Sequence, residues 1–438
     1  MRQKKKRKSF IKVFAKVLIV ILAFGFCGLF LISYLNNKAA SKGDLVTAIT
    51  ADKGIFAGIM GEGYERDEPS PVGPIEVEAA ESQSQSKYSA ILNNPEYMHV
   101  NKIYPKEAAE VNLIRIGFAG DILFDRSYSV MSSMLSAGGN IERMFSPELL
   151  DKMRGLDIMI VNNEFPYSRR GTPIPGKTYT FRADPDYVRY LGEMGVDGVT
   201  LANNHAFDYG ADALEDTFTT LEGVQMPYAG AGRNIDEASK AMTFLVNDRL
   251  VSILCASQIE RQDNPNTRGA TADRSGVFRC LDATKLCEQI SLYKQTSDVV
   301  IVFVHWGTES TAVLDWRQIE QAREFEAAGA DVVIGAHPHV LQPAGFVNDM
   351  PVAYSLGNFV FSSKLLDGAL AEVVIDLTGK TSNDLVSRSD IKVQIHPTQQ
   401  NNMKGLLLQG EQRMRVINYI NSVSEYSVLD ENGIMRQR

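Results

Sequence analysis

Apolar runs rich in β-branched residues alternate with amphipathic patterns along the chain from Val111 onward. The runs that predict buried strands are 112–119, 157–161, 198–202, 250–256, 298–304, 331–334, 351–360 and 370–377. The segments with a helical period between them are 185–194, 211–223, 283–294 and 318–328. Such alternation is typical of an α/β domain in which helices cover buried sheets. We therefore expect an α/β domain over residues 109–395.

The N-terminus has a different pattern. The run Val17–Leu35 has no charged residue, and residues 1–16 before it carry eight Lys and Arg and no acid. A helix of that length covers roughly 28 Å, close to the hydrocarbon thickness of a bilayer. The run is longer than the apolar part of a cleaved signal peptide, and only a poor cleavage candidate, Ala39-Ala40, follows it. An uncleaved single-pass anchor over residues 17–36 is favoured, with residues 1–16 cytoplasmic and the rest outside.

Two further segments flank the predicted domain. Residues 37–108 combine charge, proline and low-complexity sequence, and they predict an extracytoplasmic linker or stalk. A small folded subdomain is the alternative, because residues 45–60 are moderately apolar. Residues 396–438 predict a peripheral C-terminal segment with one amphipathic helix, 411–423.

Composition and charge narrow the class of protein. Hydrophobic residues make up 44% of the 438 residues and charged residues 22%, which is ordinary for a chain with a sizeable core. The net charge is −8, and removing the eight positives of residues 1–16 leaves −16 for the remainder, which disfavours a nucleic-acid partner. Four cysteines exclude a disulfide scaffold, although Cys280 and Cys287 could pair outside the cell.

Polar residues that a core would not select come directly after several predicted strands. In chain order they are Asp121, Asn162, Glu164, Asn203, Asn204, His205, Asp208, His305, Glu309, His337 and His339. Each has an ordinary structural explanation by itself, such as a turn for Asp121 or a satisfied core histidine for His305. Ligands bind at the carboxyl ends of strands in open α/β sheets, so the set predicts one convergent site.

The segment His337-Pro338-His339 is the most specific of these signals. On an extended stretch, two imidazoles separated by one proline point to the same side. Imidazole suits Zn, Mn and Fe, and carboxylates, an amide oxygen and imidazoles together are the ligand types of a two-metal centre that activates water. The sequence therefore predicts one or two divalent metal ions, Mn, Zn or Fe.

Six ordered motifs resemble the CapA/PgsA family, which is named for bacterial poly-γ-glutamate capsule synthesis. They are Gly120-Asp121, Asn162-x-Glu164, Asn203-Asn204-His205-x-x-Asp208-x-Gly210, His305-Trp306-Gly307, Gly335-x-His337-Pro-His339 and Ser355-Leu-Gly357-Asn358-Phe359. The resemblance runs from about Asn112 to about Leu377. The family is in turn similar to calcineurin-like metallophosphoesterases, which implies a four-layer α/β/β/α sandwich.

The resemblance also implies roles for individual residues. One metal would be held by Asn204, His305 and His337, and it would share Glu164 with a second metal. The ligands implied for that second metal are Asp121 and His339. His205 would donate a proton to the leaving oxygen, with Asp208 orienting its ring or merely stabilising the turn.

The match to the phosphoesterases is incomplete. Their first motif is Asp-x-His, and here Leu123 stands where the second ligand belongs. Their bridging Asp is Glu164 in this chain. The second metal position is therefore short of one protein ligand, and it would use Asp125 or water, bind weakly, or be empty.

Two classes of function follow. The first is a metal-dependent hydrolase or transferase acting on a phosphoester or an envelope amide; the second is a non-catalytic subunit of a poly-γ-glutamate synthesis or export complex in the bacterial cell membrane. An anionic polymer or a phosphoester would be the substrate, and nucleic acid is not expected. The candidates to bind it are Arg182, Asn162, Asn203 and Glu309, with Arg169 and Arg170 as further cations. For all three arginines a solvated surface position is the favoured explanation.

Overall fold

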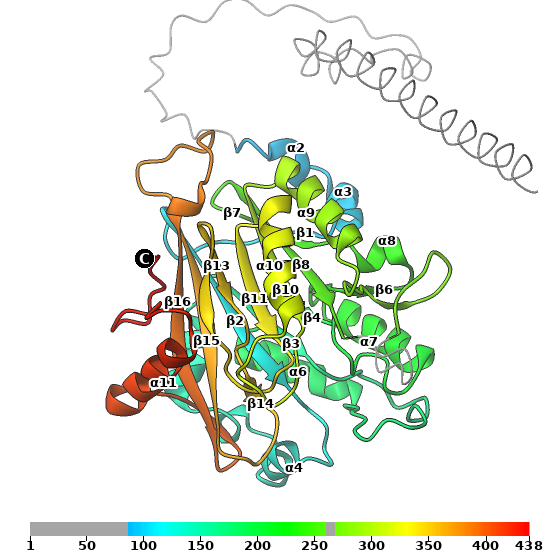
Figure 1. Cartoon of the computed structure of the whole chain (residues 1–438). Helices are drawn as coiled ribbons and strands as arrows, with labels where there is room; N and C mark the ends of the chain where they lie inside the picture. Colours follow the sequence, from blue (N-terminus) through cyan, green and yellow to red (C-terminus); the bar gives the residue numbers. More distant parts are fainter. Residues whose placement is uncertain (1–85, 260–267, 438) are drawn as a thin grey trace, which may run out of the picture. The chain divides into compact units, whose positions relative to one another are not determined.

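The computed structural model describes residues 86–259 and 268–437 (Figure 1). The predicted anchor, residues 17–36, lies outside the described residues, as does most of the predicted stalk. Within the described ranges, every helix is too short or too polar to cross a bilayer.

Two mixed β-sheets form the middle of the fold. The first contains, in spatial order, β1 (Ile103–Pro105), β7 (Met242–Val246), β8 (Arg249–Ser257), β10 (Val299–His305), β11 (Val332–Ala336), β13 (Met350–Ala353) and β12 (Ala344–Val347). The second contains β17 (Lys404–Leu407), β16 (Ile391–Asn401), β15 (Leu366–Asp376), β2 (Leu113–Ile122), β3 (Ile158–Asn163), β4 (Gly198–Thr200) and β5 (Tyr228–Ala229), with β14 (Asn358–Val360) paired to β2. A short pair, β6 (Ala231–Gly232) and β9 (Gly276–Val277), stands apart.

The helices alternate with these strands along the chain. They are α2 (Ser89–Leu92), α3 (Pro95–Val100), α4 (Ser129–Ser136), α5 (Pro147–Arg154), α6 (Arg189–Met194), α7 (Ala211–Gly223), α8 (Ile235–Ala238), α9 (Thr284–Thr296), α10 (Trp316–Ala328) and α11 (Gly410–Val423). Three 3₁₀ turns are η1 (Ile141–Arg143), η2 (Pro185–Val188) and η3 (Arg388–Asp390).

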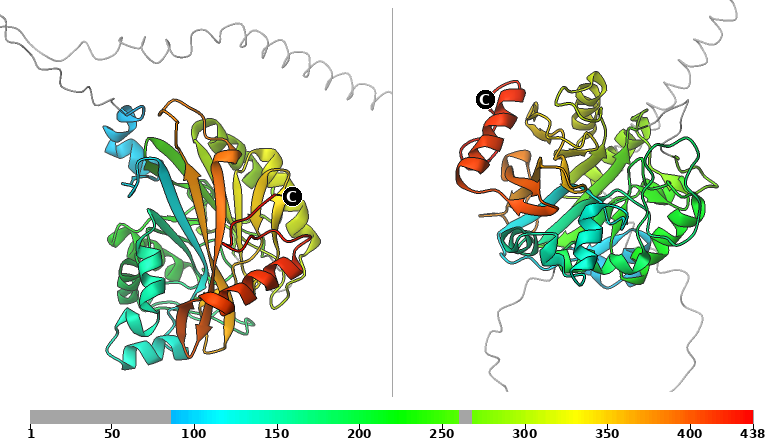
Figure 2. Two further views of the ribbon diagram at one scale, coloured as in Figure 1. Left: turned by 90° about the vertical axis from the view of Figure 1, so that its left-hand side faces the viewer. Right: turned by 90° about the horizontal axis from the view of Figure 1, so that it is seen from below.

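The two sheets pack face to face with helices outside them. Phe118 of β2 meets Phe303 of β10 edge to face, with ring centroids 5.5 Å apart. On β10, the residues that alternate with Phe303, such as Val302, face the other way and pack with α9 and α10. Helices α5 and α6 lie beyond the second sheet (Figure 2, left). The result is a helix–sheet–sheet–helix order (Figure 2), which is the layering that the family resemblance implied.

Most predicted elements are confirmed, but the single strand over 351–360 is wrong. Residues 350–353 form β13 in the first sheet, and residues 358–360 form β14 in the second. Gly357 between them has φ 66°, a left-handed conformation that interrupts an extended chain. The apolar run therefore crosses from one sheet to the other.

The folded part also extends beyond the predicted boundaries at 109 and 395. Within the predicted stalk, residues 95–100 form α3, and β1 pairs in parallel with β7. At the other end, β16 spans the boundary and pairs with β15 along almost its whole length. Ile391, Val393 and Ile395 alternate with polar residues, so a two-residue period carries this strand into the core.

Cys280 and Cys287, the two cysteines considered for a disulfide, are both thiols and are not bridged to each other. Cys280 is buried, and Cys287 is a half-buried thiol on α9. Burial raises the pKa of the Cys287 thiol to about 11, so little of the reactive thiolate forms at neutral pH.

A buried charge cluster joins three strands and a helix on the second sheet. Glu372 of β15 accepts a hydrogen bond from Lys152 Nζ at 2.6 Å and contacts His396 Nε2 at 2.7 Å. Arg115 Nη1 lies 3.4 Å away on β2. Burial alone would raise the pKa of Glu372, but the hydrogen bonds from His396 and Lys152 outweigh it and hold the pKa at about 2.

We expect Glu372→Gln to lower the free energy of unfolding at pH 7 by about 2 kcal/mol, because it leaves partly buried cations without their counter-charge. The folded pKa lies below the usual 4.5, so the carboxylate stabilises the fold above that pH and ceases to do so as pH falls towards about 2. Denaturant unfolding should show a smaller difference in unfolding free energy between the wild type and Glu372→Gln at pH 3 than at pH 7. Lys392→Gln, which breaks a 3.6 Å pair between exposed Lys392 and half-buried Asp376, is the control and should cost under about 1 kcal/mol. A pH-independent advantage would contradict the argument.

Candidate metal centre

The predicted site residues lie where parallel strands of both sheets end. Strands β2, β3 and β4 run parallel in one sheet, and β8, β10 and β11 run parallel in the other. Their ends bring together buried side chains that were far apart in sequence: Asp121, Asn162, Glu164, Asn203, Asn204, His305 and His337. All are at most 5% exposed, which is unusual for such polar residues.

Gly120 permits the close approach that sets Asp121 in place. A Cβ at Gly120 would lie 1.9 Å from the carbonyl oxygen of Gly357, so only glycine fits. The approach lets β14 pair with β2, and this pairing sets Asn358 opposite Asp121. The Gly-Asp and Gly-Asn motifs are therefore two halves of one backbone contact.

The imidazole of His305 is the centre of one group of potential ligands. Its Nε2 lies 2.8 Å from Asn204 Oδ1, 3.0 Å from His337 Nδ1 and 3.4 Å from Glu164 Oε1. These are four ligand-type atoms from separate segments, gathered around one point. They are the set that the resemblance implied for the first metal.

A second group lies on the other side of Glu164. His339 Nδ1 is 3.0 Å from Asp121 Oδ2 and 2.8 Å from Asn358 Oδ1. One ligand atom each from Glu164, His337 and His339 lie within 4.8 Å of one another, which links the two groups. Asn162 orients the carboxylate of Asp121, since its Nδ2 donates a hydrogen bond to Asp121 Oδ1 at 2.6 Å.

Several buried oxygens of the site lack hydrogen-bond donors. Such oxygens show whether the site suits a cation, because a cation can take the place of the missing donors. Both carboxylate oxygens of Glu164 accept none from any described residue. Asp121 Oδ2 faces His339 but lies outside the angular range of a hydrogen bond. An uncompensated buried carboxylate is costly, and a bound cation removes that cost. The residues present therefore fit a divalent metal.

The electrostatics of the site point the same way. Burial raises the pKa of Glu164, and the nearby Asp121 raises it further. Burial opposes ionisation of Asp121 too, but contact with His339 lowers its pKa overall. For His339, burial is outweighed by Glu164 and Asp121, which raise its pKa to about 10. With no metal bound, a protonated His339 supplies positive charge beside the carboxylates; as a metal ligand its ring would be neutral, and the cation would supply that charge instead.

The two histidines of the His-Pro-His segment do not lie on an extended stretch, so that prediction is wrong. His337 has φ 98° and His339 has φ 59°, both left-handed conformations outside the β region. Their ring centroids are 5.9 Å apart, and each ring reaches the site from a turn beyond β11. Such strained backbone is most often found at functional sites.

A second buried network adjoins the first. His205 Nδ1 lies 2.7 Å from Asp208 Oδ2, and the ring stacks on Phe181 with centroids 4.0 Å apart. Lys177 Nζ contacts Asp208 Oδ1 and the backbone oxygen of Asn204. Burial lowers the pKa of His205 to about 4 despite the opposing effect of Asp208. The ring is therefore neutral at pH 7 and is held through Nδ1.

Several other predicted residues have local roles. Asn203 Nδ2 donates to Asn162 Oδ1 at 3.0 Å, so this amide supports the site from behind. Arg182 lies over the Tyr209 ring, 4.2 Å from its centroid, and donates to the Arg170 carbonyl, and Glu309 is exposed on a loop. The remaining ones are engaged in turns and surface pairs: Asp125 with Ser127 and the Arg182 backbone, Arg169 with Asp184, and Arg170 with Asp216. Asp125 is thus a turn residue and does not supply the missing ligand.

Neither Lys177 nor the role of Asn358 was predicted from the sequence. Lys177 is only 6% exposed and sits in a long coil between β3 and η2, where neither periodicity nor a strand end marks it. Asn358 lay within a motif, but β14 was not recognised as the partner of β2. A lysine in a Gly-Pro-rich coil gives no local signal of burial, so only the tertiary fold identifies it.

Comparison with known proteins agrees with the motifs. The family model described as "Bacterial capsule synthesis protein PGA_cap" matches residues 115–363, more than half of the chain. The PGA biosynthesis protein CapA of Bacillus subtilis (strain 168) is 28% identical over 276 residues, covering 61% of this chain and 69% of that protein. The capsule biosynthesis protein CapA of Bacillus anthracis is 31% identical over 223 residues, covering 48% of this chain and about half of the relative, 52%.

Solved structures give weaker likenesses. A 5'-nucleotidase from Candida albicans SC5314 aligns with a TM-score of 0.36 and 11% identity, covering 67% of this chain and 53% of that chain. The TT1561 protein of Thermus thermophilus aligns with a TM-score of 0.34 and 10% identity, covering 61% and 96%. The motif order and the match over residues 115–363 decide the classification: this chain belongs to the PGA_cap family of bacterial capsule synthesis proteins.

Proposed function

We propose that this chain takes part in capsule or poly-γ-glutamate biosynthesis or export, and that its site binds one or two divalent metal ions, Mn, Zn or Fe. The observation that carries the metal proposal is the buried carboxylate of Glu164, whose two oxygens accept no hydrogen bond from any described residue. The relatives named for PGA and capsule biosynthesis support the process.

The proposed ligands divide between two positions. Asn204, His305 and His337 would hold one ion, Asp121 and His339 a second, and Glu164 would reach both. A bound divalent ion supplies Lewis acidity and a nucleophilic water at neutral pH. The chain's own contribution is orientation: Asn162 fixes the Asp121 carboxylate, and Lys177 fixes the Asn204 backbone.

The proposed place of action is the outer face of the bacterial membrane. The basic residues 1–16 and the uncharged run Val17–Leu35 support a single-pass anchor with a cytoplasmic N-terminus. Partner subunits of a polymer synthesis or export complex would then meet the domain outside the cell. This part of the proposal rests on the sequence alone.

Two alternatives share the same site. The protein could be a hydrolase of another envelope phosphoester or amide, an interpretation favoured by His205 and Asp208 lying in contact beside the proposed ligands. It could instead be a non-catalytic assembly subunit. The departure from Asp-x-His at Leu123 favours that second interpretation, because it leaves one metal position short of a ligand.

Metal analysis of the purified full chain tests the proposal. We expect about one to two equivalents of Mn, Zn or Fe, removed by a chelator and restored by adding the ion. Hydrolysis of generic phosphoesters and of poly-γ-glutamate is assayed on the same preparations before and after chelation. Absence of stoichiometric metal under all three ions would reject the site, whereas metal without hydrolysis would leave the assembly function.

A further inference from the structure

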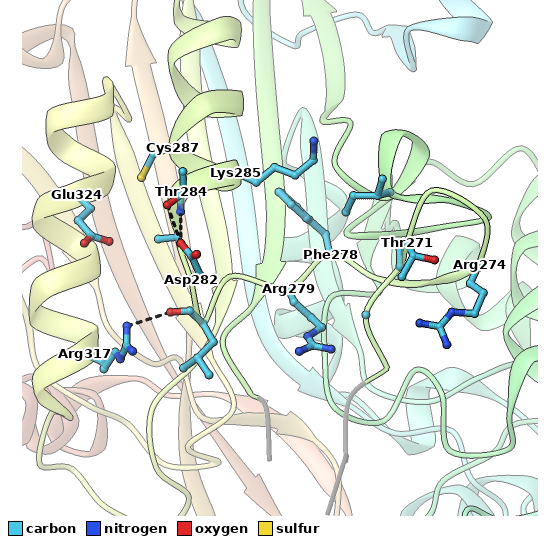
Figure 3. Close-up of a pocket in the computed structure, with 15 residues that line it drawn as sticks. Thr271, Arg274, Phe278, Arg279, Asp282, Thr284, Lys285, Cys287, Arg317 and Glu324 are labelled. Carbon is cyan, nitrogen blue, oxygen red and sulfur yellow. Dashed lines mark hydrogen bonds between the residues drawn. The ribbon is translucent and has the colours of Figure 1, made fainter. Parts of the chain in front are cut away.

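Three cavities adjoin one another, and two of them are lined partly by residues that follow His205 in the chain. The first, about 880 Å³, is lined by residues 269–287 and the α10 face (Figure 3). The second, about 760 Å³, is lined by residues 171–175 and 207–212. The third, about 380 Å³, is lined by residues 125–127 and 180–184. The first two share Arg274 and Arg279, and the second and third share Tyr209.

Basic residues outnumber acidic ones in the lining of each cavity. The first has four basic and two acidic residues, the second three and one, and the third three and two. This excess lies on a chain whose net charge beyond residue 16 is −16. A local positive band on an acidic body focuses the field and favours an anionic ligand there.

Some guanidinium groups in this band are open to a ligand, whereas Arg169, Arg279 and Arg317 already have partners. Within the described ranges, Arg126 and Arg274 are exposed and their side chains form no hydrogen bond or ion pair. Arg268 lies over the ring of Phe207, 5.4 Å from its centroid. Phe207 belongs to the loop that follows His205. Figure 3 draws Arg317 at one side of the first cavity, Arg274 at the other and Arg279 between them.

Three of the acidic residues in the linings have hydrogen-bond or ion-pair partners of their own. Asp282 accepts hydrogen bonds from the backbone N and the hydroxyl of Thr284, and Asp184 pairs with Arg169. Asp125 accepts from the Arg182 backbone. Among the described contacts, none of these three carboxylates forms a hydrogen bond or ion pair with Arg126 or Arg274, so both guanidinium groups keep their N–H donors for a ligand.

We propose that the three cavities form one cationic groove that binds a carboxylate-bearing polymer alongside the His205 loop. Naming the polymer as poly-γ-glutamate rests on the function proposed above. The arginines are distributed over three cavities, so a single small anion occupies only one cavity and leaves the arginines of the others unused. A chain of repeated carboxylates engages several at once, each through the planar fork that suits carboxylate oxygens.

Binding of fluorescent poly-γ-glutamate to the full chain tests the groove. The triple variant Arg126→Gln, Arg268→Gln, Arg274→Gln removes one cation from the third cavity, one from the second and one shared by the first two. We expect the affinity for the polymer to fall about 5- to 100-fold, which corresponds to the loss of three exposed ion pairs. The affinity of the variant should also depend less on salt concentration. The matched control is Arg143→Gln, Lys364→Gln, Lys392→Gln, which makes the same charge change on exposed residues outside the cavities.

Each outcome decides the proposal. Equal losses in the groove variant and the control would show that only net charge matters and would overturn it. Polyphosphate of equal charge bound as tightly as poly-γ-glutamate would overturn the carboxylate class. Metal content separates this inference from the proposed function: the groove variant should keep its metal, while a Glu164→Gln variant should lose metal and still bind polymer.

Discussion

Replacing Glu164 by glutamine should abolish stoichiometric metal binding and make the metal-free protein more stable. The substitution keeps the size of the side chain and removes a buried charge whose oxygens lack hydrogen bonds from any described residue. Loss of a supporting group around a metal already costs 10- to 100-fold in affinity, so loss of a ligand shared by two positions should cost more than about 100-fold. Relief of the unpaired carboxylate should raise the free energy of unfolding without metal by about 1 kcal/mol.

The two effects have opposite signs, which makes the variant informative. Metal affinity is measured by titration, and unfolding by denaturant in chelator and in excess metal. Glu309→Gln is the control, since Glu309 is an exposed acid on a nearby loop and should change neither quantity. A Glu164→Gln protein that binds metal like the wild type would remove Glu164 from the ligand set.

The fold was predictable where the local pattern and the tertiary environment agree. Residues 299–305 are all buried and β-branched or apolar up to His305, so the run predicts a central strand that the structure contains as β10. Helix 211–223 was predicted with its observed bounds because its apolar face repeats at the helical period. The run 351–360 failed because one apolar stretch serves two sheets, and hydrophobicity does not record which sheet a residue enters.

The site was predictable in composition and less so in geometry. Polar residues at strand ends identified the buried cluster, because parallel strands bring their carboxyl ends to one edge. The conformation of His337 and His339 was not predictable, since a left-handed φ in a non-glycine residue is a tertiary constraint. Lys177 escaped for a related reason: its burial comes from Asp208 and Asn204, residues that are remote in sequence.

The second large effect is expected on replacing His205, and it distinguishes a catalytic function from an assembly function. Its Nδ1 is held by Asp208, and its ring is stacked on Phe181. Among the described residues none bonds Nε2, so that nitrogen is the one left to exchange a proton with a substrate. If hydrolysis occurs, His205→Ala should lower turnover by about 10²- to 10⁴-fold while leaving metal content unchanged. His99→Ala, at an exposed histidine on α3, is the control.

The same variant has a different consequence if the protein only assembles a complex. Burial of His205 then serves packing, and alanine leaves a cavity that costs stability but spares polymer production in cells. A smaller defect in Asp208→Asn than in His205→Ala would indicate that Asp208 orients the ring and does not itself exchange the proton. Full complementation of polymer production by His205→Ala, together with failure of Glu164→Gln to complement, would contradict the catalytic function. Metal would then be a structural component of the domain, and the domain would act by binding polymer in the cationic groove.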